Sequence, residues 1–395
     1  MHLYDEVIAA GKEENILLEA PTRDTCYIFS YTSGTTGTPK AVMMTHKMNV
    51  ATAAAINLVV PFNESDSHMS FLPYAHSMEQ CLTATFIQQG VKIFYYSGDV
   101  LKLLEDVAVA KPTVFVGVPR LLNKLYAKIN SNVQAAGGSK EKLFRSAIES
   151  KIANLKATCS YTSGFYDAIV FKKIRAILGG NVRVMITGSA PIAKEVMDFL
   201  KVAFSCPIIE GYGQTEVCGG ATVTMALDPN AGKVGGPVGA VKIRLRDVPE
   251  MGYTSRDIPN PRGEVQFFGP SNFKGYFRNP EKTAEAFDED GWVCSGDVGE
   301  ILEDGSIRII DRAKNIFKLS QGEYIAPEKL ENIYIQAALV AQMFVYGHSL
   351  QNWLVAVAVL DPETLGPWCA LKGQDFAAVK ADPNGFPALK DDVFA

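Results

Sequence analysis

The sequence lacks the excess of basic residues with which proteins hold nucleic acids. It contains 38 lysines and arginines against 43 aspartates and glutamates, a formal net charge of −5 at pH 7. With this balance of charges, the protein has no extended positive electrostatic field that could hold the phosphate backbone of a nucleic acid by counterion release. We therefore expect no nucleic acid among its partners, and a small anion has to be held by a few local groups.

Cysteine is scarce, and its spacing excludes the common metal and disulfide patterns. The chain has no Cys-x-x-Cys pair, and its seven cysteines lie far apart, at Cys26, Cys81, Cys159, Cys206, Cys218, Cys294 and Cys369. This argues against a zinc site and against a disulfide framework. The pattern is typical of reduced thiols in an intracellular protein.

A signal peptide and a long apolar run are also lacking. The first ten residues, MHLYDEVIAA, have neither a basic flank nor an apolar core, so no signal peptide is predicted. The most apolar stretch near the C-terminus, residues 337–360, is interrupted by His348, Gln351 and Asn352. Two strands around a turn fit this stretch better than a transmembrane helix.

What is present is the composition of a soluble globular protein with room for two domains. Of the 395 residues, 47% are hydrophobic and 21% are charged. Short β-rich runs alternate with helical patterns from Cys26 to Gly213, which predicts an α/β fold of parallel βαβ units with helices on both faces of the sheet. The predicted strands cover residues 26–31, 67–74, 91–96, 113–119, 182–188 and 207–213.

Three segments depart from this alternation. Residues 130–164 are charged and contain glycine and serine, which predicts an inserted surface helix followed by a loop. After Asp228 the predicted strands are shorter and more antiparallel in character, up to Gly299. Residues 311–315 form a short charged segment after a strand, and this predicts a hinge between two domains.

The segment YTSGTTGTPK at 31–40 has the composition of a phosphate-binding loop, and it lies between a predicted strand and a helix predicted after Thr45. Its glycines let backbone amides approach an anion, its hydroxyl groups can donate, and its lysine supplies a positive charge. The spacing differs from the Walker pattern, and an ordinary turn is the alternative. As a phosphate cradle the segment would use Thr32, Ser33, Gly34, Thr35, Thr36, Gly37 and Lys40.

The segment EGYGQTE at 210–216 follows a β-run and supplies a second candidate site. The flat tyrosine ring between two glycines offers a face for stacking. A carboxylate beside a phosphate is electrostatically unfavourable unless a cation lies between them. Together with the cradle, this segment resembles the adenylate-forming superfamily of acyl- and aryl-CoA synthetases, luciferases and peptide-synthetase adenylation domains. The resemblance implies that Tyr212 stacks on adenine, Thr215 contacts phosphate and Glu216 holds Mg²⁺, within a site that includes Gly211 and Gly213.

Further motifs extend the resemblance in the same order along the chain. For SGDVGE at 295–300, the resemblance implies that Asp297 accepts hydrogen bonds from both ribose hydroxyls. In IIDRAKN at 309–315, it implies that Arg312 binds the nucleotide sugar or phosphate. An aspartate in a glycine-flanked turn is otherwise commonly a turn former.

Two more segments are similar to loops that border the substrate in this superfamily. TGSAP at 187–191 implies that Gly188, Ser189 and Ala190 line the site near adenine and the acyl carbonyl. LPYAHSME at 72–79 places His76 where the family has a histidine beside the carboxylate pocket. The family usually has an aromatic residue two positions later, where this chain has Met78.

Three stretches resemble the eukaryotic-type long-chain acyl-CoA synthetases in particular. They are VPRLLNKLY at 118–126, the insertion to Gly164, and IFKLSQGEYIAPEKLENIY at 316–334. The resemblance implies that Lys314 is the hinge between the two half-reactions and that Lys318 and Gly322 approach CoA. It also implies a large AMP-binding domain at 1–311, with layered α/β and small barrel-like parts, and a small α+β domain at 312–395.

The implied reaction activates a long-chain fatty acid with ATP and Mg²⁺ and transfers the acyl group to coenzyme A. The residues expected to act in it are Lys40, His76, Thr215 and Glu216. Only residues 1–30 precede the cradle, and no PTxK motif follows Pro367, so the large domain is expected to lack its upstream part and the small domain to be incomplete. No adenylating lysine is therefore assigned.

Two alternatives stay open at this point. One is a medium-chain or aryl acyl-CoA synthetase, and the other is a non-catalytic protein that binds nucleotide or acyl chains. By analogy with the family, we expect an intracellular location at the cytoplasmic face of membranes such as the endoplasmic reticulum, with peripheral membrane association. The sequence does not report chain-length preference or oligomeric state.

Overall fold

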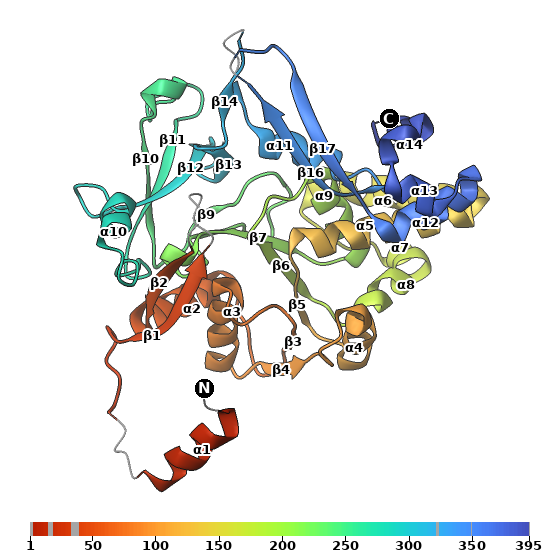
Figure 1. Cartoon of the computed structure of the whole chain (residues 1–395). Helices are drawn as coiled ribbons and strands as arrows, with labels where there is room; N and C mark the ends of the chain where they lie inside the picture. The colour runs from red at the N-terminus through yellow and green to blue at the C-terminus, as the bar shows by residue number, and fades with distance from the viewer. Residues whose placement is uncertain (1–2, 15–18, 33–38, 321–323, 349, 395) are drawn as a thin grey trace.

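A seven-stranded sheet forms the centre of the computed structural model, which describes residues 3–14, 19–32, 39–320, 324–348 and 350–394 (Figure 1). The strand order is β4-β3-β5-β6-β7-β8-β9, in which the first five strands are parallel and the last two antiparallel. This confirms the predicted parallel α/β core. The strands are β3 (Ser67–Ser70), β4 (Lys92–Tyr95), β5 (Val114–Val116), β6 (Val184–Gly188), β7 (Ile208–Tyr212), β8 (Thr222–Val223) and β9 (Gly236–Pro237).

Helices cover both faces of this sheet. Along β5, Val114 and Val116 face one hydrophobic cluster and Phe115 faces another, because successive side chains of a strand point to opposite faces. The first cluster is completed by α2 (His46–Val59) and α3 (Ser77–Gln88). The second is completed by α4 (Leu103–Ala110), α5 (Pro119–Ala136), α6 (Gly138–Thr158) and α9 (Lys194–Phe204).

The segment around the cradle differs from its predicted form. Strand β1 (Cys26–Thr32) pairs antiparallel with β2 (Lys40–Thr45) in a separate hairpin, so β1 is not part of the parallel sheet. The helix predicted after Thr45 is confirmed as α2, which begins at His46 and is capped by the Thr45 side chain, but strand β2 between the cradle and this helix was not predicted. Residues 40–45 form a short apolar run, and periodicity alone cannot distinguish such a run from the start of a helix.

The antiparallel strands predicted after Asp228 form a second sheet of four strands. Its order is β10-β11-β12-β13, and it packs on the first hydrophobic cluster through residues such as Val265 and Phe267. The strands are β10 (Lys242–Arg246), β11 (Arg262–Phe268), β12 (Val293–Ile301) and β13 (Ile307–Arg312), with α10 (Pro280–Ala286) between β11 and β12.

The predicted surface insertion is wrong in its second half. Helix α6 extends to Thr158 and packs against α5 and α9. Its Lys151 is 1% exposed and donates to Asp167 Oδ1 (2.6 Å), the carbonyl of Val202 (2.6 Å) and Ser205 Oγ (2.8 Å). The charged composition predicts a solvated segment, whereas this lysine satisfies its charge inside the core.

The C-terminal part packs around a hydrophobic cluster of its own, which contains Leu365, Trp368 and Cys369. Residues 337–360 form a two-stranded hairpin, as predicted. The elements are β14 (Phe317–Lys318), β15 (Tyr324–Ile325), α11 (Pro327–Tyr334), β16 (Val340–Gly347), β17 (Leu354–Leu360), α12 (Pro362–Lys372), α13 (Phe376–Ala381) and α14 (Pro387–Phe394).

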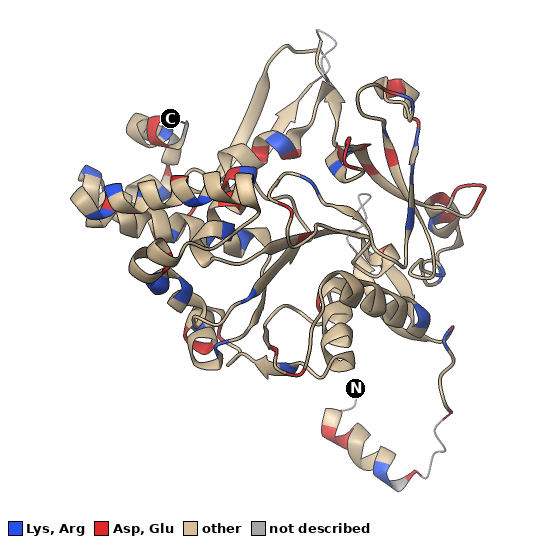
Figure 2. Cartoon of the chain, turned by 180° about the vertical axis from the view of Figure 1, so that it is seen from behind, with Lys and Arg blue, Asp and Glu red and all other residues tan. Residues whose placement is uncertain are grey.

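Three further α-helices occur among the described residues. Helix α1 (Tyr4–Glu13) lies apart from the rest of the chain in Figure 1, and α7 (Gly164–Tyr166) and α8 (Lys172–Arg175) flank a π-helical turn. Lysines and arginines alternate with aspartates and glutamates along many elements (Figure 2). Among the described residues, no helix has both the length and the apolar character needed to cross a bilayer.

Candidate functional site

The two glycine-containing loops meet at the carboxyl ends of β6 and β7. Gly188 and Gly211 are direct partners in the parallel ladder. A Cβ atom on Gly188 would lie 2.7 Å from the carbonyl oxygen of Gly211, so only glycine permits this approach. The predicted loops at 187–191 and 210–216 are thus brought together at the strand ends, where α/β folds usually bind ligands.

Tyr212 and Asp297, which were predicted to hold the nucleoside, are in contact. The Tyr212 hydroxyl donates to Asp297 Oδ2 at 2.7 Å, and the Gln214 amide donates to the same oxygen at 2.9 Å. Burial raises the pKa of the Asp297 carboxyl, and the bond from Tyr212 opposes this shift. A buried carboxylate with two donors is a strong acceptor, so this cluster can exchange its internal bonds for those of a ligand hydroxyl.

Arg312 lies opposite Asp297 in the ladder between β12 and β13. Its Nε atom is 3.8 Å from Asp297 Oδ1 and 3.9 Å from Glu328 Oε1 on α11. The Arg312 side chain is 59% exposed, so these ion pairs are weak and leave the guanidinium available to another anion.

Lys40 and Glu216 are joined through a residue that the motifs did not include. Lys40 Nζ donates to the Tyr276 hydroxyl at 3.1 Å, and this hydroxyl donates to Glu216 Oε1 at 2.6 Å. Burial, and then the nearby Glu216 carboxylate, raise the pKa of Tyr276, which stays protonated. Thr215 begins the short 3₁₀ turn that carries Glu216.

His76 lies at the start of α3. Its Nδ1 accepts a hydrogen bond from the backbone amide of Met78 at 3.3 Å, which assigns the other ring nitrogen as the one that carries hydrogen. Partial burial lowers the pKa of His76, although its side chain still reaches solvent. Met78, the residue that departs from the family pattern, lies with its sulfur 3.7 Å from Ser189 Oγ.

An apolar cavity of about 40 Å³ lies between these helices and strand ends. Ile56, Cys81 and Leu82 line it from α2 and α3, and Gly188, Ser189 and Gly211 border it from the predicted loops. The cavity therefore adjoins the candidate site and is large enough for little more than one water molecule in this conformation. Ala190, which is exposed, is not among its lining residues.

Part of the predicted site lies outside the described residues. Ser33, Gly34, Thr35, Thr36 and Gly37 of the cradle, and Gly322 on the CoA side, belong to this part. The two ends of the cradle are fixed nevertheless, because Thr32 and Lys40 are paired across the β1–β2 hairpin. Lys318 is paired with Tyr324 in the small ladder between β14 and β15.

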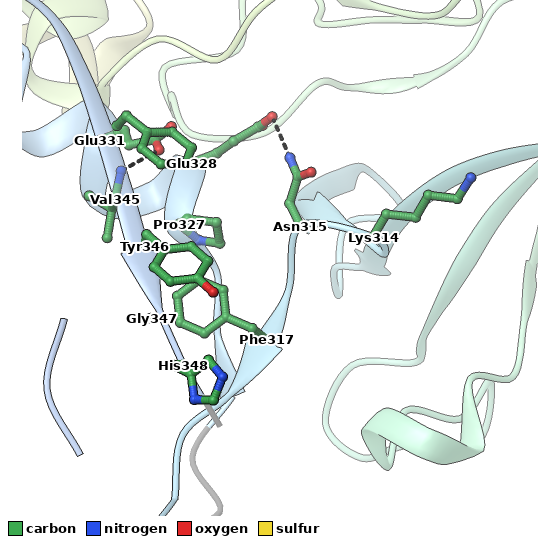
Figure 3. A pocket seen from close by; sticks show the side chains of 11 residues that line it. Lys314, Asn315, Phe317, Pro327, Glu328, Glu331, Val345, Tyr346, Gly347 and His348 are labelled. Carbon is green, nitrogen blue, oxygen red and sulfur yellow. Dashed lines mark hydrogen bonds between the residues drawn. The ribbon is translucent and has the colours of Figure 1, made fainter. Parts of the chain in front are cut away.

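The predicted hinge region borders a pocket of its own, of about 590 Å³ (Figure 3). Lys314 and Asn315 line one side, and the rings of Phe317 and Tyr346 lie 6.3 Å apart within it. Tyr212 and Asp297 do not line this pocket.

Sequence reasoning missed two residues of this cluster. Gln214 stands inside the EGYGQTE motif, and a polar side chain close to Tyr212, the tyrosine predicted to stack on adenine, was a usable signal. Tyr276 follows Gly275 in a loop segment and forms an isolated bridge with Val42, and nothing in its local sequence indicates a contact with Lys40.

The comparisons with known proteins agree with this geometry. The family model of the AMP-binding enzymes matches residues 3–277. Long chain acyl-CoA synthetase 6, peroxisomal, of Arabidopsis thaliana is 44% identical over 99% of this chain and 56% of its own length. Long-chain-fatty-acid–CoA ligase 1 of Homo sapiens is 44% identical over 89% of this chain and 50% of its own length. The chain thus spans about half the length of the curated relatives it matches.

A solved structure supports the same assignment. The A domain of carboxylic acid reductase from Segniliparus rugosus, in complex with AMP and a co-purified carboxylic acid, is 30% identical with a TM-score of 0.72. The match covers 92% of this chain and 54% of that one. With the family model matching more than half of its residues, the chain belongs to the family of AMP-binding enzymes.

Proposed function

We propose that this chain activates a long-chain fatty acid with ATP as an acyl-adenylate and passes the acyl group to coenzyme A. The observation that carries the proposal is that the end of β7 and the turn after it join both the Tyr212–Asp297 pair and the Lys40–Tyr276–Glu216 series. The names of the two curated relatives support the fatty-acid substrate.

The nucleoside end of ATP would be held by Tyr212 and Asp297. The ring of Tyr212 would stack on adenine, and the Asp297 carboxylate would accept hydrogen bonds from the ribose hydroxyls. Arg312 would add a positive charge beside the sugar or phosphate. Gly188, Ser189, Ala190, Gly211 and Gly213 would shape the surrounding wall, because glycine lets the backbone approach a ligand closely.

The phosphate end would be held by the cradle and by Lys40. Thr32, Ser33, Gly34, Thr35, Thr36 and Gly37 would supply amides and hydroxyls, and Thr215 would add another donor. A lost donor of this kind typically costs about 3 kcal/mol in the transition state, near a hundredfold in rate.

Glu216 fits a Mg²⁺ ion that binds with the nucleotide. The described residues contain no group of three or more histidine, cysteine or acidic side chains suited to a metal. Mg²⁺ commonly binds through one or two carboxylates together with substrate phosphates and water, so a single glutamate is adequate. The ion would neutralise charge on the phosphates during the transfer.

The fatty carboxylate would attack the α-phosphorus beside His76, with pyrophosphate leaving, and the CoA thiol would then displace AMP. The acyl chain would enter the apolar cavity between α2, α3 and the strand ends, which has to widen because it holds only about 40 Å³. Each buried CH₂ contributes about 0.8 kcal/mol, so two more carbons in a fitting tunnel improve binding roughly tenfold.

The chain would divide at residue 311 into a large nucleotide domain and a small domain that begins at Arg312. The separate hydrophobic cluster of the C-terminal part supports this division. Lys314 would be the hinge, and Lys318 and Gly322 would face CoA. One relative is named as peroxisomal, and a membrane-associated, cytoplasmic-face location for this chain stays a prediction.

Hydroxylamine trapping tests the proposed function. The chain, supplied with ATP and Mg²⁺, should form the hydroxamate of palmitate much faster than that of acetate or coumarate. A preference for coumarate would indicate an aryl acid as the substrate. Binding of AMP without any hydroxamate would indicate a non-catalytic binder.

Asp297→Ala provides the matched variant for the nucleoside site. We expect it to remove most of the rise in melting temperature that ATP gives, since ligand at a hundredfold excess over Kd stabilises by about 2.7 kcal/mol. Asp24→Ala, at a half-exposed carboxylate that pairs with Arg23 outside the candidate site, should leave the rise unchanged. An equal rise in Asp297→Ala and the wild type would remove Asp297 from the ribose site.

A further inference from the structure

Tyr276 lies between the two oppositely charged groups of the phosphate end. Its hydroxyl accepts from Lys40 Nζ at 3.1 Å and donates to Glu216 Oε1 at 2.6 Å. Each charged group is thus bonded to the phenol, and among the described residues the two form no ion pair with each other. A phenol suits this position because it accepts and donates at the same time.

The backbone around Tyr276 is tied to both partners. Met43 of β2 donates to the carbonyl of Gly275 at 3.1 Å, so the strand that begins at Lys40 is fastened to this segment. Phe273 donates to the carbonyl of Glu216 at 2.9 Å. Residues 273–277 therefore hold the backbone near Lys40 and Glu216 in place through main-chain bonds, and the Tyr276 hydroxyl lies between the ends of the two side chains.

The ring of Tyr276 is held in place by its neighbours. It is 5% exposed, lies 5.0 Å from the ring of Phe273, and has Lys40 Nζ 4.3 Å above its centroid. Gly275 before it has a φ of +134°, and a Cβ there would lie 2.6 Å from Thr283, so the turn requires glycine. The hydroxyl is thereby aimed at one point between the two charges.

We propose that Tyr276 is a positioning residue that keeps Lys40 and Glu216 apart while the nucleotide is absent. Without the hydroxyl, the ammonium and the carboxylate would close into a direct ion pair. Mg²⁺·ATP would have to break that pair, because Lys40 must turn to a phosphate and Glu216 to the metal. The inference rests on the proposed function, and it adds a role for a residue outside the recognised motifs.

Calorimetric titration of the 395-residue chain with Mg²⁺·ATP and with AMP tests this role. Tyr276→Phe should weaken Mg²⁺·ATP binding about tenfold, the size expected for hydrogen bonds to charged groups. AMP binding should change less than twofold, because Tyr212 and Asp297 hold the nucleoside. Tyr27→Phe is the control, since Tyr27 is a tyrosine whose hydroxyl donates to the neutral amide of Gln80 at 2.9 Å, and it should affect neither ligand.

Making Tyr276→Phe in a chain that already carries Glu216→Gln distinguishes a positioning role of Tyr276 from a general structural effect. A glutamine cannot form the competing ion pair, so adding Tyr276→Phe to Glu216→Gln should change Mg²⁺·ATP binding less than twofold. A further tenfold loss in the double variant, or an equal loss of AMP and Mg²⁺·ATP binding in Tyr276→Phe, would overturn the inference. If the wild-type chain bound neither Mg²⁺·ATP nor AMP, this result would overturn the proposed function itself, and the inference with it.

An ultraviolet difference spectrum of the wild-type chain gives a readout that does not depend on the stability of a variant. AMP should perturb the tyrosine band through Tyr212 alone. Mg²⁺·ATP should add a second component, since Tyr276 loses both charged partners. Identical tyrosine spectra in the two complexes would contradict the inference.

Discussion

Glu210 carries a buried carboxyl group on β7, directly before the paired Gly211. It is 7% exposed, and burial raises its pKa to about 8, while Lys201 opposes the shift. At neutral pH the folded chain therefore holds a proton on Glu210 that the unfolded chain has released. The folded state binds more protons than the unfolded state, so raising the pH disfavours folding.

This sets a pH window for the contribution of Glu210 to stability. The contribution is complete below pH 4.5, the ordinary value, and is lost as the pH rises to about 8. We expect Glu210→Gln to flatten the fall in unfolding free energy across this window, by an amount on the order of a few kcal/mol. Denaturant unfolding at a series of pH values measures it. Glu195→Gln, at an exposed position of α9, should keep the wild-type slope, and an unchanged slope in Glu210→Gln would contradict the assignment.

Single residues also show how far the sequence alone could reach. Tyr212, Asp297 and Glu216 could be predicted as site residues because each stands in a short motif at a predicted strand end, where local sequence carries the information. The contact of Tyr276 with Lys40 joins positions far apart in sequence. Such a contact depends on tertiary packing, and neither propensity nor periodicity records it.

Among the elements, β6 and β7 position the site through the close approach of their ends. A methyl group at Gly188 would meet the carbonyl of Gly211 at 2.7 Å, so the two strand ends would have to separate. We expect Gly188→Ala to destabilise the chain by about 1–3 kcal/mol and to weaken AMP binding. Thermal unfolding with and without AMP measures both effects.

The control for this change lies in the same sheet. Gly236 on β9 has nothing within 4 Å of its Cβ position, so Gly236→Ala should leave both stability and AMP binding near the wild-type values. If Gly188→Ala behaved like Gly236→Ala, the strand ends would not be as closely fitted as the distances indicate.

The elements that the sequence predicted well are those with a clear period and clear ends. The parallel strands β3 to β7 alternate with helices, and their apolar runs match a sheet buried on both faces. The failures have physical reasons as well. The short apolar strand β2 has too few residues to show a period, and the charge of Lys151 on α6 concealed its burial.

At the scale of the whole molecule, the C-terminal part touches the rest of the chain mainly through polar contacts. Lys124 on α5 pairs with Glu363 on α12 at 2.9 Å, and Asp311 accepts the backbone amide of Glu328 at 3.1 Å. The Lys124–Glu363 ion pair is exposed, and such pairs contribute little to stability. The third hydrophobic cluster shares no residue with the other two, so it can unfold as a unit of its own.

Leu365→Ala tests this division. Leu365 is 3% exposed in the third cluster, and truncating such a leucine costs about 2–5 kcal/mol. If the parts are separate domains, the variant should lower the unfolding midpoint reported by fluorescence of the neighbouring Trp368, while AMP binding changes less than twofold. Leu371→Ala, at an 83% exposed position of the same helix, should leave the midpoint unchanged. Loss of AMP binding together with the Trp368 transition would instead show that residues 312–395 and the nucleotide site unfold as one cooperative unit.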